Sequence, residues 1–142
     1  IADHILLKPG RLSVEEFEQI KAHPVIGEKV LNSLLAYAPQ CTFIRMGRDI
    51  AGAHHEKWDG SGYPNALAGE SIPLSARIVA LVDVYDALTS PRCYKRPFSH
   101  EEAMALILEG KGKHFDPKLV DSFMVISEQF AVLSKASLLE ED

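Results

Sequence analysis

The order of apolar and polar residues along the chain predicts helices throughout. Apolar side chains recur at intervals of three and four positions, which is the period of a helix with one buried face. Ser13 with Glu16 and Ser99 with Glu102 have the spacing of a capping box, in which two side chains satisfy free backbone amides at a helix start. The expected helices cover residues 13–23, a stretch between residues 24 and 39, residues 42–55, residues 73–89, residues 99–110 and residues 116–130.

The apolar positions on these helices identify the expected core. The helix over residues 73–89 is apolar on nearly every side, which predicts that most of it is buried. On the other helices the apolar residues form one stripe, which predicts a single face against the core. The predicted core residues are Val25, Ile26, Val30, Leu31 and Leu34; Phe43, Met46 and Ile50; Ala103, Leu106 and Ile107; and Leu119, Val120, Phe123, Ile126 and Phe130.

The composition fits one compact globular domain over residues 1–136, followed by an acidic tail over residues 137–142. The 142 residues are 46% hydrophobic and 25% charged, which is enough to bury a core. The formal net charge of -5 argues against binding of nucleic-acid polymers, which need a basic face. No apolar run approaches the ~20 residues of a membrane span. Cys41 and Cys93 lack metal-type spacing, and we expect a cytoplasmic protein with reduced cysteines.

The adjacent histidines His54 and His55 are the first candidates for chemistry. On a helix, adjacent side chains point about 100° apart. The two histidines are therefore expected to serve two metal ions, or two edges of one cluster, rather than a single ion. Glycines and Pro64 follow them and predict a tight loop beside the site. Glu56 comes directly after the histidines. Its side chain could contact the metal or serve a purely structural role, and the sequence leaves both open.

Asp83 and Asp86 lie at positions i and i+3 of the apolar helix, so they share one of its faces. An isolated buried carboxylate is costly unless it is paired, protonated or bound to a metal. A structural ion pair with Arg77 or Arg92 is one explanation for them. Beside the paired histidines a metal site is the better explanation, because imidazole and carboxylate commonly bind a metal together.

A basic turn follows that helix, with Arg92, Lys95 and Arg96 close together in the sequence. A solvated turn is the ordinary interpretation of such a charge cluster. Here the turn comes directly after the carboxylate-bearing helix, so it is also placed to hold an anionic substrate against the metals. The planar fork of arginine suits phosphate oxygens, and lysine adds a compact point charge.

Several short motifs follow one another along the chain, and their order carries more information than any one of them alone. They are Lys8-Pro9-Gly10-Arg11-Leu12-Ser13, His23-Pro24, His54 to Pro64, Leu67 to Val79, Asp83 to Thr89, Arg92 with Tyr94-Lys95, and His114-Phe115-Asp116-Pro117. Together they resemble the HD-GYP domain, a branch of the HD metal-dependent phosphohydrolases. The resemblance extends from residue 3 to residue 130, and the order and spacing of the motifs argue against chance agreement.

The resemblance implies an all-α, multi-helix HD-type phosphohydrolase bundle that hydrolyses cyclic di-GMP, a bacterial second messenger. It implies two or three divalent metal ions, with iron or manganese favoured. The family's metal ligands fall on His23, His54, His55 and Asp83. Its substrate-binding residues fall on Tyr63, Arg92 and Lys95, and its catalytic residues on Asp86 and Lys95. The implied protein partners are GGDEF-type or other signalling proteins, and a homodimer is a further option.

One departure from the family pattern concerns the His-Asp pair that gives the family its name. No His-Asp dipeptide occurs in this chain, so the chain resembles the C-terminal part of such a bundle, truncated at its N-terminal side. We expect this part alone to be nearly inactive, to hold metal loosely and to expose an apolar face that favours self-association. The alternative is a non-catalytic HD-GYP-like signalling module that acts by protein–protein interaction.

Overall fold

The structure, a computed structural model, describes the backbone of residues 1–90 and 96–137 and the side chains of these residues up to Val132. Within these residues it contains seven α-helices, one 3₁₀ turn and no β-strand, so the all-α prediction is confirmed. Within the same residues, none of the helices combines the length and the apolar composition needed to cross a bilayer. The elements are α1 (Asp3–Leu6), α2 (Val14–Ile20), α3 (His23–Leu35), α4 (Thr42–Ala53), the 3₁₀ turn η1 (Gly69–Ser71), α5 (Leu74–Thr89), α6 (His100–Glu109) and α7 (Pro117–Ser137).

Both predicted capping boxes are present. At the start of α2, the Ser13 hydroxyl accepts from the Glu16 amide at 3.2 Å, and the Glu16 carboxylate accepts from the Ser13 amide at 2.6 Å. Ser99 and Glu102 make the same two bonds at the start of α6, at 3.1 and 2.7 Å. The predicted boundaries differ elsewhere: α1 was not predicted, and α4 ends at Ala53, before both histidines.

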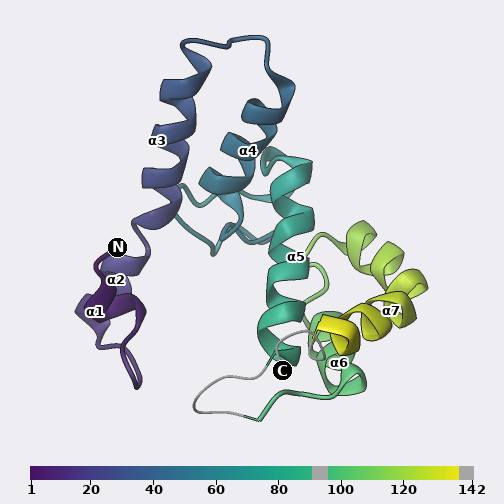
Figure 1. The fold of residues 1–142 in the computed structure, drawn as a ribbon. Coiled ribbons are helices and arrows are strands. Elements are labelled where there is room, and N and C mark those ends of the chain that lie inside the picture. Colours follow the sequence, from purple (N-terminus) through teal and green to yellow (C-terminus); the bar gives the residue numbers. More distant parts are fainter. Residues whose placement is uncertain (91–95, 138–142) are drawn as a thin grey trace.

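Helix α5 connects the two parts of the molecule, with the α3–α4 hairpin beside its first half and α6 and α7 beside its second half (Figure 1). A small cluster of Ala53, Ile72 and Ala76 holds the end of α4 against the start of α5. The larger core joins α5 to α6 and α7. It contains Leu81, Tyr85, Ala103, Met104, Ile107, Phe115, Val120 and Phe123.

Helix α5 is buried along one face only, which corrects the prediction that most of it is buried. Its buried residues are Ala76, Ala80, Leu81, Tyr85 and Thr89. Asp83 and Asp86 lie on the exposed side of the helix. On α6 and α7 the prediction is closer, because four of the named residues are buried while Leu106 and Ile126 are exposed. The four buried residues are Ala103, Ile107, Val120 and Phe123.

The predicted core face of α3 and α4 is wrong for most of the residues named for it. The exposed ones are Val25, Ile26, Val30, Leu34, Phe43 and Met46, and Phe43 is 77% exposed. Helices α3 and α4 pack on each other, and α4 packs on α5, while their outer apolar sides are exposed. An exposed apolar face was expected, whereas the idea that it favours self-association stays a prediction.

A buried ion pair joins α5 to the start of α7. The Arg77 guanidinium donates from Nη1 to Asp116 Oδ2 at 2.6 Å and from Nε to the Ile72 carbonyl at 2.9 Å. The other oxygen of Asp116 accepts from the Lys118 amide at 2.9 Å. The partner of Arg77 is therefore Asp116, so the suggested pairing of Arg77 with one of the α5 carboxylates is wrong.

The chain segment after the paired histidines is tied to the turn before α7. The Trp58 amide donates to the His114 carbonyl at 3.0 Å, and the Asp59 amide donates to the Lys113 carbonyl at 2.9 Å. The Arg77 guanidinium lies 5.8 Å from the centre of the Trp58 indole ring. The ion pair and the turn together fix where the loop leaves the end of α4.

Candidate metal centre

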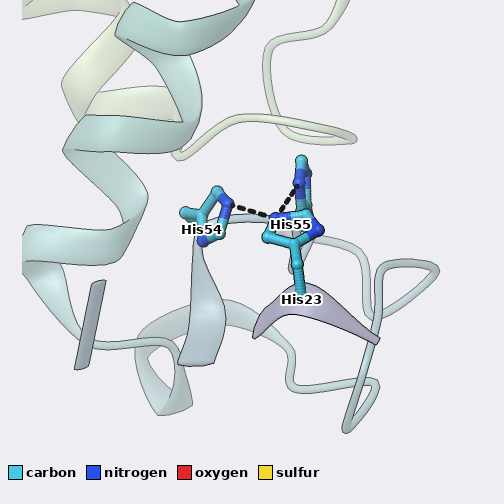
Figure 2. A group of neighbouring side chains, drawn as sticks. All are labelled: His23, His54 and His55. Atoms are coloured by element: carbon cyan, nitrogen blue, oxygen red, sulfur yellow. Dashed lines mark hydrogen bonds between the residues drawn. The ribbon is translucent and has the colours of Figure 1, made fainter. Parts of the chain in front are cut away.

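Three histidine rings from two helix ends meet at one point (Figure 2). His23 Nε2 lies 3.1 Å from His54 Nε2 and 3.2 Å from His55 Nε2. One ligand atom from each of the three rings lies within 4.8 Å of the other two. Histidines that are 31 and 32 positions apart in the sequence therefore share a single small site.

The local backbone explains how two adjacent histidines point to the same place. His54 is the residue that ends α4, and His55 lies beyond the helix. Their ring centres are 4.1 Å apart, with the planes tilted by 39°. The expectation that they diverge by about 100° is wrong, because it assumed a helix through both residues. His23 joins them from the first position of α3, which packs against α4.

The hydrogen bonds of the His23 and His54 rings leave their Nε2 atoms as bare acceptors. His23 Nδ1 lies 2.8 Å from the Ile20 carbonyl, and His54 Nδ1 lies 2.9 Å from the Ile50 carbonyl. A carbonyl only accepts, so Nδ1 carries the proton in both rings and Nε2 presents a lone pair. Two lone pairs that face each other at 3.1 Å repel unless a cation or a proton lies between them. A backbone carbonyl on the far nitrogen is also the usual way in which proteins orient a metal-binding histidine.

His55 is kept in its neutral form. Burial, together with charge repulsion from the neighbouring His54 and His23, lowers its pKa to about 4. Asp83 acts in the opposite direction. A neutral imidazole is the form that binds a metal ion.

The distances from His23 Nε2 to the other two Nε2 atoms fit a divalent metal ion. At metal–nitrogen bond lengths of about 2.0–2.1 Å, neighbouring ligand atoms around one ion are about 3.0–3.4 Å apart. The observed separations of 3.1 and 3.2 Å between Nε2 atoms fall within that range. Imidazole groups suit iron, zinc, copper and nickel, so the ligands alone do not select one metal.

Asp83 lies near this centre but outside the group of three nitrogens. Its charge acts on both His55 and Tyr63, which places the carboxylate on the same side of the molecule. It is exposed, so the argument that a buried carboxylate needs a metal does not apply to it. Asp86 is also exposed and accepts from the Ser90 hydroxyl at 3.1 Å. A metal role for Asp83 and a catalytic role for Asp86 stay predictions.

Of the predicted substrate residues, the structure describes only Tyr63. Its ring stacks on His55, with centres 4.8 Å apart and planes 22° from parallel. Burial raises the pKa of the Tyr63 hydroxyl, and the negative charge of Asp83 raises it further. Arg92 and Lys95 lie outside the described residues.

Glu56 holds the loop that carries Tyr63, a role that the sequence left undecided. Its side chain is 1% exposed, and its two oxygens accept from the Asn65 amide at 2.7 Å and the Leu67 amide at 3.0 Å. Any side chain at Gly62 would collide with the backbone of residues 56 and 57. The loop therefore folds back on the segment that follows His55. The only sequence signal for this is an acidic residue at the start of a glycine-rich stretch.

Several known proteins are similar to this chain over most of its length. The sequence profile described as HD domain matches residues 3–119. A Vibrio cholerae protein described as a probable cyclic di-GMP phosphodiesterase is 49% identical over 142 residues, which is 99% of this chain and 32% of that protein. A second one, described as a cyclic di-GMP phosphodiesterase, is 50% identical over 134 residues, 94% of this chain and 27% of its own length.

The description of a third Vibrio cholerae protein gives it a different substrate specificity. It is described as 3'3'-cGAMP-specific phosphodiesterase 2 and is 41% identical over 138 residues, which is 97% of this chain and 25% of that protein. The chain thus spans about a third or less of the length of these curated relatives.

Proposed function

Because the chain belongs to the HD domain family, in its HD-GYP branch, we propose that it forms part of a metal-dependent phosphodiesterase that hydrolyses cyclic di-GMP. The observation that carries the proposal is the meeting of three histidine Nε2 atoms, of which those of His23 and His54 face each other as unprotonated acceptors. Relatives described as cyclic di-GMP phosphodiesterases match nearly the whole chain and support the choice of substrate.

His23, His54 and His55 are the residues that would hold the metal, and Asp83 is proposed to join them. When bound, divalent ions in such a site lower the pKa of a water molecule and neutralise charge on the phosphate. We propose two or three ions and favour iron or manganese, as in the family. Ligands outside this chain, including a His-Asp pair, are proposed to complete the set.

The remaining predicted residues are assigned to the substrate. Arg92 and Lys95 are proposed to pair with phosphate oxygens, where two cations offset the charge that builds up during phosphodiester cleavage. Asp86, on the same exposed face of α5 as Asp83, is proposed to act with Lys95 in catalysis. Tyr63 borders the substrate through its stacking on His55. A cytoplasmic location, signalling partners and a homodimer stay predictions.

A non-catalytic signalling module is less well supported. A domain that only docks onto partners has no need for three converging histidines, two of which have their far nitrogens fixed by backbone carbonyls. Several relatives are also described as phosphodiesterases rather than as binding proteins.

The test separates metal binding from substrate binding in the full-length protein. His55→Ala is expected to lower the bound metal, measured by mass spectrometry, and to abolish hydrolysis of cyclic di-GMP, measured by chromatography. Arg92→Ala is expected to keep the metal and lose at least about tenfold in affinity for the substrate, which is about 1.4 kcal/mol. Arg11→Ala, at an exposed position, is the matched control and should change neither. Equal metal loss in His55→Ala and Arg92→Ala, or metal-loaded wild type without hydrolysis, would refute the proposal.

A further inference from the structure

A pocket lies on the side of Tyr63 toward helix α2, and its other lining residues have no role assigned so far. It has a volume of about 330 Å³ and is lined by Glu18, Lys21, Ala22, Tyr63 and Pro64. The Tyr63 ring belongs to this pocket and at the same time stacks on His55. A molecule that reaches the histidine centre therefore has this pocket beside it.

Lys21 is held in place at the pocket wall. Its Nζ donates to the Glu18 carboxylate at 2.7 Å and lies 5.3 Å from the centre of the Phe17 ring and 5.6 Å from the centre of the Tyr63 ring. A cation over two aromatic faces is stabilised by their negative electrostatic surface. An ordinary surface lysine samples many rotamers, whereas these three contacts pre-order Lys21 for a ligand.

The pocket offers a hydrogen-bond donor and an acceptor side by side. The Lys21 side chain is 32% exposed and Glu18 is 60% exposed, so both remain accessible to a ligand. Exchanging their mutual bond for bonds to a ligand costs little, because an exposed ion pair contributes only about 0–1 kcal/mol. Tyr63 and Pro64 supply a flat apolar wall next to this pair.

We propose that this pocket binds a guanine base of the substrate, an inference that rests on the proposed function. Guanine presents an acceptor, O6, beside two donors, N1–H and N2–H, and the amino group of Lys21 and the carboxylate of Glu18 match that order. Adenine presents an amino donor where guanine has O6, and it would face Lys21 with a donor. In the substrate, one sugar separates the base from its phosphate. In the protein, the Tyr63 ring separates the pocket from His55, so a base in the pocket would place its phosphate toward the histidines.

Charge argues against a phosphate in the same place. Lysine binds phosphate readily, but Glu18 stands 2.7 Å from the ammonium group and would repel an anion there. A neutral base with both donors and acceptors uses the two side chains together. Glu18 and Lys21 are therefore assigned to base selection rather than to charge neutralisation.

The experiment measures the dissociation constants of cyclic di-GMP and cyclic di-AMP for the metal-loaded full-length protein. Wild type is expected to prefer cyclic di-GMP. Glu18→Gln and Lys21→Met are each expected to weaken cyclic di-GMP binding about tenfold, since a good base contact is worth about 1–3 kcal/mol. They should leave cyclic di-AMP binding and metal content within about twofold of wild type. The exposed Glu109→Gln and Lys29→Met are the matched controls and should change neither constant.

Three outcomes would overturn the inference: no preference in wild type, no change in either variant, or equal weakening of both dinucleotides. The last outcome would show that the pocket acts through charge alone. Hydrolysis by wild type is measured separately. A protein that binds cyclic di-GMP with this base preference but never cleaves it would refute the proposed function and leave the guanine pocket standing.

Discussion

Two polar clusters of this chain bring distant residues together. They differ in whether the protein itself supplies a partner for each charged or polar group. In the ion pair, Arg77 and Asp116 carry opposite charges 2.6 Å apart, while Arg77 Nε donates to the Ile72 carbonyl and the second Asp116 oxygen accepts from the Lys118 amide. In the histidine centre, by contrast, three Nε2 atoms meet, and those of His23 and His54 face each other as acceptors. The first cluster satisfies itself within the protein. The second calls for a cation.

The difference separates a structural use of polar residues from a functional one. Asp116 is only 4% exposed, and a buried charge of this kind must be fully paired to be tolerated. The histidines are half-buried and reachable from solvent, as a site that exchanges metal and substrate has to be. Replacing a residue of the ion pair should therefore affect stability first. Replacing a histidine should affect metal binding first.

The largest effect is expected at the histidine centre. His54→Ala in the full-length protein removes a ligand whose orientation is fixed by the Ile50 carbonyl. Loss of a partner that merely orients a ligand already costs about 10–100-fold in metal affinity, so loss of the ligand should cost about 100-fold or more. Metal titration by calorimetry measures it. His100→Gln is the control, because His100 bonds to Tyr85 away from the centre and should leave metal affinity unchanged.

The ion pair should show the opposite pattern. Asp116→Asn leaves the Arg77 guanidinium without its charged partner and should lower the free energy of unfolding by about 3–5 kcal/mol. Urea unfolding checks the value. Replacing both residues together, as Arg77→Met with Asp116→Leu, should cost less than Asp116→Asn alone, because no unpaired charge remains. If Asp116→Asn abolished metal binding in molecules that are still folded, the division between the two clusters would be wrong.

Replacing Glu56 should have an intermediate effect on stability and should also disturb the loop beside the site. Glu56→Gln keeps the shape but turns one of the two acceptors for the Asn65 and Leu67 amides into a donor. An unsatisfied buried group costs about 1–3 kcal/mol, so stability should fall by that amount. The loop with Tyr63 should loosen, and proteolysis near residues 60–66 should become faster. Unchanged stability and unchanged proteolysis would contradict the role assigned to Glu56.

The smallest effect is expected for a surface ion pair between the turn before α7 and α7 itself. Lys111 donates to Asp121, and Asp121 is well exposed. Asp121→Asn is the same chemical change as Asp116→Asn, only five positions further along the chain. It should lower the free energy of unfolding by less than about 1 kcal/mol, because exposed ion pairs contribute little. A loss as large as that of Asp116→Asn would show that burial is not what separates the two pairs.

Local features of the sequence predicted the fold well. The capping boxes at Ser13 and Ser99 depend on residues three positions apart, so the sequence contains everything that they need. The apolar stripes on α3 and α4 were harder to interpret. Periodicity shows that one face of a helix is apolar, but not whether another element covers it. Phe43 and Met46 were placed in the core for that reason and are exposed.

The site was predictable mainly through the family resemblance. His23 contacts His54 across more than thirty positions, and no local sequence pattern predicts that contact. The angle between His54 and His55 was predicted wrongly because α4 ends just before them, and a boundary shifted by two residues redirects both rings. Asp116 was noted as part of a motif, yet only the fold shows that its partner is Arg77.

The central claim is that His23, His54 and His55 bind a metal ion through their Nε2 atoms. Crystals of the full-length protein grown with manganese allow a direct test, by an anomalous difference map recorded near the manganese absorption edge. We expect a peak about 2 Å from all three Nε2 atoms. A well-ordered histidine cluster without a peak, or a peak held by other side chains with these rings turned away, would contradict it.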